Sequence, residues 1–216
     1  MKNRVFVIGG GSSLKGFDFT KLDREDTICV NKSVFYLNNP TYFITIDATF
    51  MNKVDVNEFK SLKCSKFFVL QKYLPYIEDK NGVIKDTRFN FIYDLSLFDI
   101  IIKANREENF GKMWNDFASC SNSGASAIQL AILLGYKKIY LLGMDLCVKG
   151  ENTHFHEGYG QSKEKFYSFM KEKYLDKTYK SIKNWDGDSE IISCSPISIL
   201  NNIIKYKSIN DILNGK

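Results

Sequence analysis

Residues 123–145 read SGASAIQLAILLGYKKIYLLGMD, and this stretch decides the fold class. Its first half, 123–134, is rich in Ala, Ile and Leu, contains no proline and ends at Gly135, which predicts a helix. The run KKIYLLGMD at 137–145 follows at once and predicts a strand that ends at a glycine and an aspartate. A helix followed closely by a strand is one unit of a parallel sheet.

Other short apolar runs predict further strands of the same sheet: RVFVI at 4–8, TICV at 27–30, YFITI at 42–46, KFFVL at 66–70 and SEIISC at 189–194. Several of them stop at a polar residue or at a glycine turn. Ligands of open parallel sheets bind beyond the carboxyl ends of the strands. We therefore predict an α/β fold with a Rossmann-like, open, mostly parallel sheet and helices on both faces. Residues 9–13, Asn31 and Asp47 should share its ligand-binding edge.

We predict one domain over residues 1–216. Residues 71–118 are read as an insertion or small lid, and residues 148–162 as a flexible active-site loop. The amphipathic run at 162–174 predicts a helix, and Pro196 should open a final helix through ILNNII.

The composition limits the classes of protein to which the chain could belong. The net charge of +5 comes from basic residues spread along the chain, which argues against nucleic-acid binding and suits phosphate- or carboxylate-bearing substrates. The chain has no apolar stretch of about 18 residues and no signal-peptide pattern, so we expect a cytoplasmic protein without a membrane span. The cysteines are odd in number and lack C-x-x-C spacing, which indicates reduced thiols at Cys29, Cys64, Cys120, Cys147 and Cys194. The sequence leaves a homo-oligomer open.

The first candidate site is GGGSSLKG at 9–16, which contains Gly9, Gly10, Gly11, Ser12 and Ser13. Glycines let a ligand approach the backbone, and exposed N–H groups at such a turn favour a phosphate or nucleotide. The motif is neither a Walker A loop nor a full dinucleotide fingerprint, since the last glycine of the latter is replaced here by leucine. The alternative is a plain tight turn after a strand.

Two further segments carry candidate nucleotide contacts. SNSGAS at 121–126 includes Ser123 and Gly124 and opens the predicted helix, whose N–H groups could bind a second anion or need only an N-cap. Asp145 lies just past a strand end, where it would contact a ribose or base, or be a solvated aspartate. We leave these alternatives open.

The only histidines of the chain are His154 and His156, within THFHEGYG at 153–160. Together with Glu157 they would suggest a metal site, but no third ligand is evident. We prefer one histidine as general base or acid, because its ordinary pKa lies near neutrality. A histidine bonded within a loop is the alternative.

Several segments in this order resemble a known group: GGGSSLKGFDF, VNKS, PTYFITID, SGASAIQLAILLGYKKIYLLGMDL, a His-bearing loop and CSPISIL. They resemble the bacterial sialyltransferase family that includes the Campylobacter lipooligosaccharide enzymes. They are equally similar to the related domain of the motility accessory factors, implicated in placing nonulosonic acids on flagellin, and to proteins encoded by phages. The match is strongest at 4–19, 28–47 and 121–147.

The resemblance implies a glycosyltransferase that uses a CMP-activated sugar donor and a glycan or protein acceptor, and that requires no cofactor or metal. By position, Gly9, Gly11, Ser12 and Asn31 would line the phosphate and ribose. Ser123 and Gly124 would hold the nucleotide, and Asp145 would contact the nucleoside. A histidine would deprotonate the acceptor hydroxyl, and we choose His156 over His154.

The chain departs from the sialyltransferase pattern at Gly10, Ser12 and Asp47. The sialyltransferases have an asparagine in place of Asp47, and a carboxylate near a donor phosphate would repel it unless a cation or proton intervenes. Asp47 fits the motility-factor version of the pattern.

A second resemblance is to archaeal-type 6-hydroxymethylpterin diphosphokinases, which use ATP. It implies that Asp47 and Asp145 hold Mg²⁺. A third hypothesis is a non-catalytic nucleotide-binding protein of the kind that phages encode, since fold does not fix function.

Overall fold

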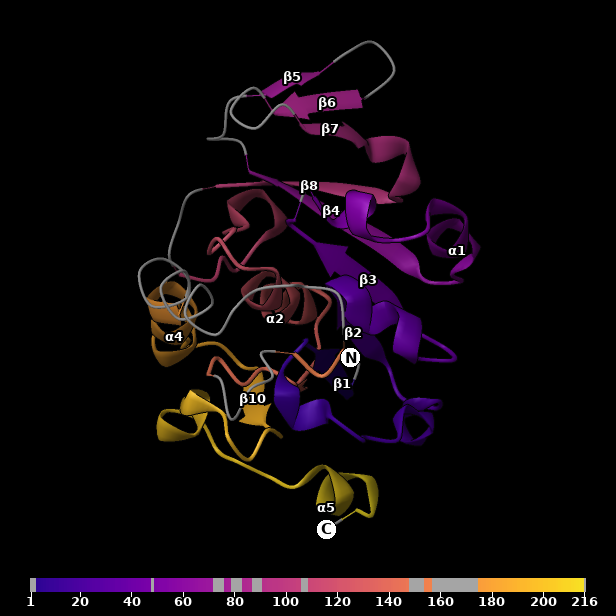
Figure 1. Cartoon of the computed structure of the whole chain (residues 1–216). Coiled ribbons are helices and arrows are strands. Elements are labelled where there is room, and N and C mark those ends of the chain that lie inside the picture. The colour runs from indigo at the N-terminus through magenta and orange to yellow at the C-terminus, as the bar shows by residue number, and fades with distance from the viewer. Residues whose placement is uncertain are drawn as a thin grey trace.

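A seven-stranded sheet forms the centre of the molecule, and all of its strands are parallel (Figure 1). The structure is a computed structural model that describes residues 3–47, 49–71, 76–78, 83–86, 91–105, 109–147, 154–156 and 175–215. In sheet order the strands are β10 (Glu190–Ser193), β9 (Lys138–Leu142), β1 (Arg4–Ile8), β2 (Thr27–Val30), β3 (Tyr42–Thr45), β4 (Ser65–Gln71) and β8 (Ile100–Ala104).

The central strands are buried on both faces because apolar residues occupy every position of their inner parts. In β1, Val5 and Val7 belong to one hydrophobic core, while Phe6 and Ile8 belong to the other. Alternate side chains of a strand point to opposite faces, so a short unbroken apolar run supplies both cores.

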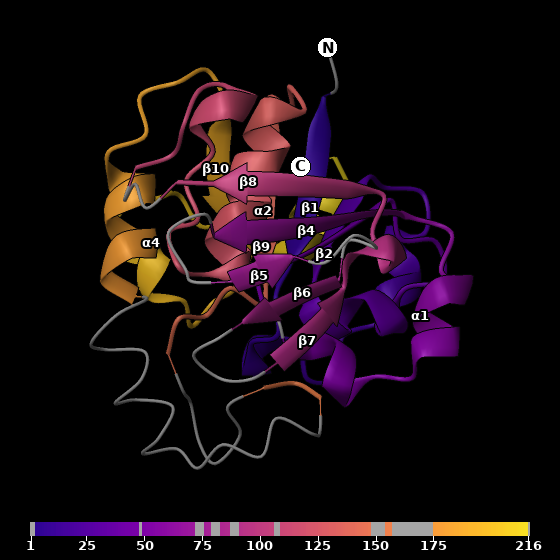
Figure 2. The same cartoon turned by 90° about the horizontal axis from the view of Figure 1, so that it is seen from above.

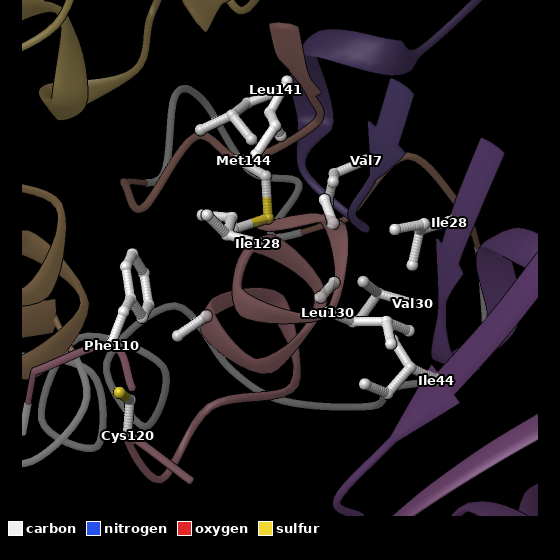
Figure 3. Close-up of a cluster of buried hydrophobic side chains, with 14 of the residues drawn as sticks. Val7, Ile28, Val30, Ile44, Phe110, Cys120, Ile128, Leu130, Leu141 and Met144 are labelled. Atoms are coloured by element: carbon white, nitrogen blue, oxygen red, sulfur yellow. The ribbon is translucent and has the colours of Figure 1, made fainter. Parts of the chain in front are cut away.

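Helix α2 (Ser123–Leu133) covers one face, where it packs on Val7, Ile28, Val30 and Ile44 (Figure 3). Helix α4 (Leu175–Lys183) lies on the same side of the sheet, outside α2 (Figures 1 and 2). The long helix and the strand that follows it therefore form the αβ unit that the sequence predicts.

The opposite face is covered by short elements. They are α1 (Val56–Ser61) and the 3-10 segments η1 (Ser12–Leu14), η2 (Phe19–Leu22), η3 (Asn31–Tyr36) and η4 (Phe50–Lys53) (Figure 2). Phe43, Phe50 and Phe59 are fully buried here with ring centroids 5.0–5.7 Å apart. Packed rings of this kind stabilise this thinner layer.

The chain changes direction across the sheet between β1 and β9. From β1 it proceeds outward through β2, β3, β4 and β8, and it then returns to add β9 and β10 on the other side of β1. Such a switch point is where open α/β sheets bind their ligands. The glycine-rich turn after β1 and the Gly-Met-Asp segment after β9 therefore meet at the switch point.

Residues 71–118 contain two different parts. A three-stranded antiparallel sheet of β5 (Tyr76–Glu78), β6 (Val83–Asp86) and β7 (Phe91–Asp94) lies beyond the edge of the main sheet (Figure 1). It is followed by η5 (Leu95–Leu97), by edge strand β8 of the main sheet, and by η6 (Trp114–Asp116). The predicted insertion thus also includes a strand of the main sheet.

The helix predicted from Pro196 through ILNNII is wrong. This segment is a single 3-10 turn, η7 (Ile199–Asn202), and the last helix is α5 (Ile209–Leu213). The N–H of Ile199 donates to the carbonyl of Asp145, which fixes the turn against the end of β9. The helix predicted at 162–174 lies outside the described residues. Within the described parts of the chain, no helix has the length and apolar character needed to span a bilayer.

Candidate functional site

The glycine-rich turn after β1 continues the pairing with the end of β9. The N–H groups of Gly9 and Gly11 each donate to a backbone carbonyl of that segment at 2.8 Å. These two N–H groups are therefore occupied within the chain, because the neighbouring segment accepts their hydrogen bonds. Among the described residues the N–H of Gly10 has no hydrogen-bond partner, so it is the turn's candidate donor for an anion.

Two glycines of the turn are required by close approach of the chain to itself. A Cβ at Gly9 would lie 2.5 Å from the carbonyl oxygen of Gly143. A Cβ at Gly11 would lie 2.4 Å from the carboxyl carbon of Asp145. Close packing between the ends of β1 and β9 therefore requires these glycines, whether or not a ligand binds.

The Asp145 carboxylate fastens this turn. One oxygen accepts hydrogen bonds from the hydroxyls of Ser13 (2.5 Å) and Ser195 (2.6 Å). The other accepts from the N–H of Ser13 at 2.9 Å and from the hydroxyl of Ser12 at 3.5 Å. The side chain is 2% exposed, so it is not a solvated strand-end aspartate. Hydrogen bonds to a charged group are the strong ones, and these hold three segments together.

The histidine segment lies against the same turn. His154 forms an antiparallel bridge with Gly11, and the N–H of Phe155 donates to the carbonyl of Gly10 at 3.0 Å. A Cβ at Gly10 would lie 2.9 Å from Cδ2 of His154 and 3.4 Å from Nε2 of His156. Both imidazoles therefore border the glycine-rich turn.

The two imidazoles influence each other's charge. Their ring centroids are 5.4 Å apart. Burial, together with repulsion from His156, lowers the pKa of His154 from 6.5 to about 4, although Asp145 acts in the opposite direction. His154 is therefore neutral at pH 7.

This pKa predicts a pH-dependent stability. Between pH 6.5 and 4 the unfolded chain binds a proton at position 154 that the folded protein does not, so stability should fall as the pH falls through this range. We expect the unfolding midpoint in urea to drop less between pH 7.5 and pH 5 in His154→Asn than in the unchanged protein. Equal drops in both proteins would contradict the assignment.

Polar side chains connect the ends of β2 and β3. The Thr45 hydroxyl donates to the side-chain oxygen of Asn31 at 2.7 Å and accepts from the N–H of Asp47 at 2.9 Å. Asn31 adopts a φ of 53°, which few non-glycine residues adopt. Because Thr45 binds the amide oxygen, the Asn31 side-chain NH₂ is the group that a ligand would meet.

Asp47 has a counter-ion within the chain. One carboxylate oxygen accepts from the N–H and hydroxyl of Thr49, at 2.9 and 2.8 Å, and the other lies 3.4 Å from the Lys53 ammonium. Both members of this ion pair are partly exposed. Lys53 is thus a cation that offsets the negative charge of Asp47.

The start of α2 is capped by its own neighbour. The Asn122 side-chain oxygen accepts from the N–H groups of Gly124 (2.7 Å) and Ala125 (3.1 Å). The Ser123 hydroxyl accepts from the N–H of Ile46 at 3.2 Å, and a Cβ at Gly124 would meet Met144 at 2.4 Å. These contacts agree with the alternative in which this segment serves for N-capping and packing. They also occupy N–H groups that a second anion would need.

Sequence reasoning missed several residues of the site. Thr45 and Ser195 read as ordinary strand-end residues, and Lys53 and Tyr36 carried no motif. Ser195 had one usable signal, because it follows the last strand and so lies at the same sheet edge as the other candidates. Among the described residues, no three His, Cys, Asp or Glu side chains are grouped to hold a metal ion.

Comparison with solved structures identifies the fold. The sialyltransferase CstII from Campylobacter jejuni, in complex with the substrate analogue CMP-3FNeuAc, matches with a TM-score of 0.52 and 16% identity, over 95% of this chain and 85% of that one. A variant of CST-II in complex with CMP matches with a TM-score of 0.54 and 17% identity, over 94% and 86%. The chain shares the fold of CstII. The predicted Rossmann-like α/β architecture is thereby confirmed.

Sequence comparison adds a second relative. The probable 3-deoxy-manno-octulosonic acid transferase of Escherichia coli K12 is 28% identical in an alignment of 184 positions, which covers 71% of this chain and 64% of that protein. The match therefore spans less than two thirds of the relative's length. No family model matches the chain.

Proposed function

We propose that the protein is a glycosyltransferase. It transfers a sugar from a CMP-linked donor to an acceptor hydroxyl by direct displacement, with His156 as the general base. The observation that carries this proposal is the bridge between Gly11 and His154, which places a histidine pair against a glycine-rich turn at the switch point of the sheet. A direct displacement on a nucleotide sugar brings together a site for the departing phosphate and a base for the acceptor hydroxyl.

The turn supplies the nucleotide site in this proposal. The N–H of Gly10 binds the donor phosphate, and the Asn31 side-chain NH₂ binds the phosphate or ribose. Asp145, Thr45, Gly9 and other packed residues hold these donors in place without reaching the ligand. Lys53 provides the cation that makes Asp47 compatible with an anionic donor.

The reaction follows from these positions. His156 accepts the proton of the acceptor hydroxyl, and the resulting oxygen attacks the anomeric carbon of the donor. A new carbon–oxygen bond forms while the bond between the anomeric carbon and the phosphate oxygen breaks. CMP leaves with the electron pair, and the N–H of Gly10 stabilises the charge on its phosphate.

His156 suits the role of base better than His154. The pKa of His154, lowered to about 4, makes its imidazole a weak base at neutral pH. The ring of His154 also packs most closely on Gly10, at 2.9 Å from its Cβ position. We therefore assign His154 to positioning the turn and the neighbouring histidine.

The donor sugar is proposed from the two relatives together. Sialic acid and 3-deoxy-manno-octulosonic acid are both 3-deoxy-2-ulosonic acids, and the names of the two relatives refer to their transfer. The donor proposed here is a CMP-linked sugar acid of this class, which includes the nonulosonic acids.

The magnesium-dependent diphosphokinase is less well supported by the donor set. Both carboxylate oxygens of Asp145 accept hydrogen bonds from Ser12, Ser13 and Ser195. Those of Asp47 are taken by Thr49 and Lys53. Mg²⁺ is bound through carboxylate oxygens, and here these oxygens already have partners within the chain.

A thermal-shift titration tests the proposed function. We expect CMP to stabilise the protein without Mg²⁺, by about 2.7 kcal/mol when its concentration is about 100 times the dissociation constant. UMP and AMP are the matched controls for the base. Stabilisation by ATP only with Mg²⁺ would favour the diphosphokinase. No shift with any nucleotide would contradict nucleotide binding altogether.

A further inference from the structure

An aromatic cluster borders the proposed base. It is made of Phe19 from η2, Tyr36 from the end of η3, and Phe155, and it extends to the ring of His156. The centroid of Tyr36 lies 4.8 Å from that of Phe155, 5.9 Å from that of Phe19 and 6.0 Å from that of His156. Phe155 also contacts the imidazole of His156 edge-on at 4.9 Å.

Tyr36 is the exposed member of this aromatic cluster. It is 45% exposed, whereas His156 is 8% exposed. Single exposed aromatic residues are common and need no explanation. Tyr36 differs because three neighbouring rings hold it, and because its ring lies only 23° from the plane of the imidazole that we propose as the base. It therefore offers a fixed, solvent-facing apolar surface beside the reacting atoms.

The proposed transfer reaction indicates which molecule would lie on this surface. In the proposed function the donor phosphate binds at the turn, so the acceptor is the molecule that must bring its hydroxyl to His156. Its hydroxyl has to come within about 3 Å of the imidazole nitrogen. A group lying on Tyr36 must therefore combine a flat apolar face with hydroxyls at its rim.

A pyranose ring has both features, with C–H groups on its faces and hydroxyls around its edge. A serine or threonine side chain of a protein acceptor has no such face. We propose that Tyr36 is the stacking platform of an acceptor subsite, and that the acceptor is a carbohydrate. This inference rests on the proposed function, because it takes His156 as the base.

Saturation-transfer NMR with methyl pyranosides tests the subsite. The probes are methyl β-galactoside, methyl α-glucoside and methyl α-mannoside, each titrated with and without CMP. We expect Tyr36→Ala to weaken binding of the best glycoside about tenfold, because this is the effect of losing one aromatic stacking partner. Tyr36→Phe keeps the ring and should bind within about twofold of the unchanged protein.

Tyr206→Ala is the matched control. Tyr206 is 43% exposed, close to the 45% of Tyr36, but it lies beside β10 at the edge of the sheet. Its loss should leave glycoside binding unchanged. Affinity for CMP, measured by calorimetry, should be equal in all of these variants.

The outcomes separate the two proposals. Equal glycoside binding by Tyr36→Ala and the unchanged protein would overturn the platform, as would binding of a serine-containing peptide by a protein that binds none of the glycosides. Failure of CMP to bind would overturn the proposed function instead. In that case the titrations without CMP still decide whether Tyr36 binds a sugar.

Discussion

Replacement of His156 by alanine should lower the rate of sugar transfer roughly 10²–10⁴-fold, the usual contribution of a general base. The acceptor hydroxyl would then have to lose its proton to water, while the nucleotide site remains. Affinity for CMP should stay within about threefold, since no donor proposed for the phosphate belongs to His156. The transfer is measured in the presence of an acceptor, by chromatography of the CMP that is released.

His154→Ala is the informative partner variant. Its ring packs on Gly10, so loss of the ring should weaken CMP binding more than the His156 variant does. The rate at saturating donor should suffer less, because a base with a pKa of about 4 contributes little near neutral pH. Undiminished transfer after loss of both histidines would refute the mechanism.

Replacement of Asp145 by alanine should lower the free energy of unfolding by about 3 kcal/mol, because it removes hydrogen bonds to a buried charged group and leaves hydroxyls without partners. The Ser195 hydroxyl is the most affected, since that residue is 1% exposed. Urea unfolding followed by circular dichroism measures the loss. CMP affinity should fall as well, because Ser12 and Ser13 lose the contact that positions the turn.

Asp94→Ala is the matched control for Asp145. The Asp94 carboxylate also binds the N–H and hydroxyl of a single serine, Ser96, but it does so at the surface, beside the three-stranded sheet. Its loss should cost no more than about 1 kcal/mol, as for other helix caps, and should not alter CMP affinity. Equal losses in the two variants would show that Asp145 is an ordinary cap.

The strands were predictable because each is a short run of apolar residues buried on both faces. TICV at 27–30 matches β2 at both ends, and RVFVI at 4–8 matches β1. Strand β8 was not predicted, because it lies within residues 71–118, which were read as an insertion or small lid. As an edge strand it also mixes exposed Ile100 and Lys103 with buried Ile102. Periodicity alone does not distinguish such a strand from a loop.

The sequence predicted at which edge of the sheet the candidate residues lie, but it predicted the role of each residue less well. Strand ends at one sheet edge gave the correct neighbourhood of Gly10, Asn31 and Asp145. Sequence could not show what approaches each glycine. Gly11 is read from sequence as space for a phosphate, whereas the nearest atoms to its Cβ position belong to Asp145. Contacts between residues far apart in the chain, such as Asp145 with Ser195, leave no local pattern.

The contacts of Asp145 also determine when, during synthesis of the chain, the turn after β1 can take its final shape. Its carboxylate joins the turn after the first strand to Ser195, which follows the last strand and is 50 residues further along the chain. A nascent chain whose β10 is still inside the ribosome therefore lacks one of the hydrogen bonds that shape the turn. The turn can acquire its full set of hydrogen bonds only after Ser195 has left the ribosome, so a nascent chain that stops before this residue should bind nucleotide at the proposed site more weakly than the finished protein.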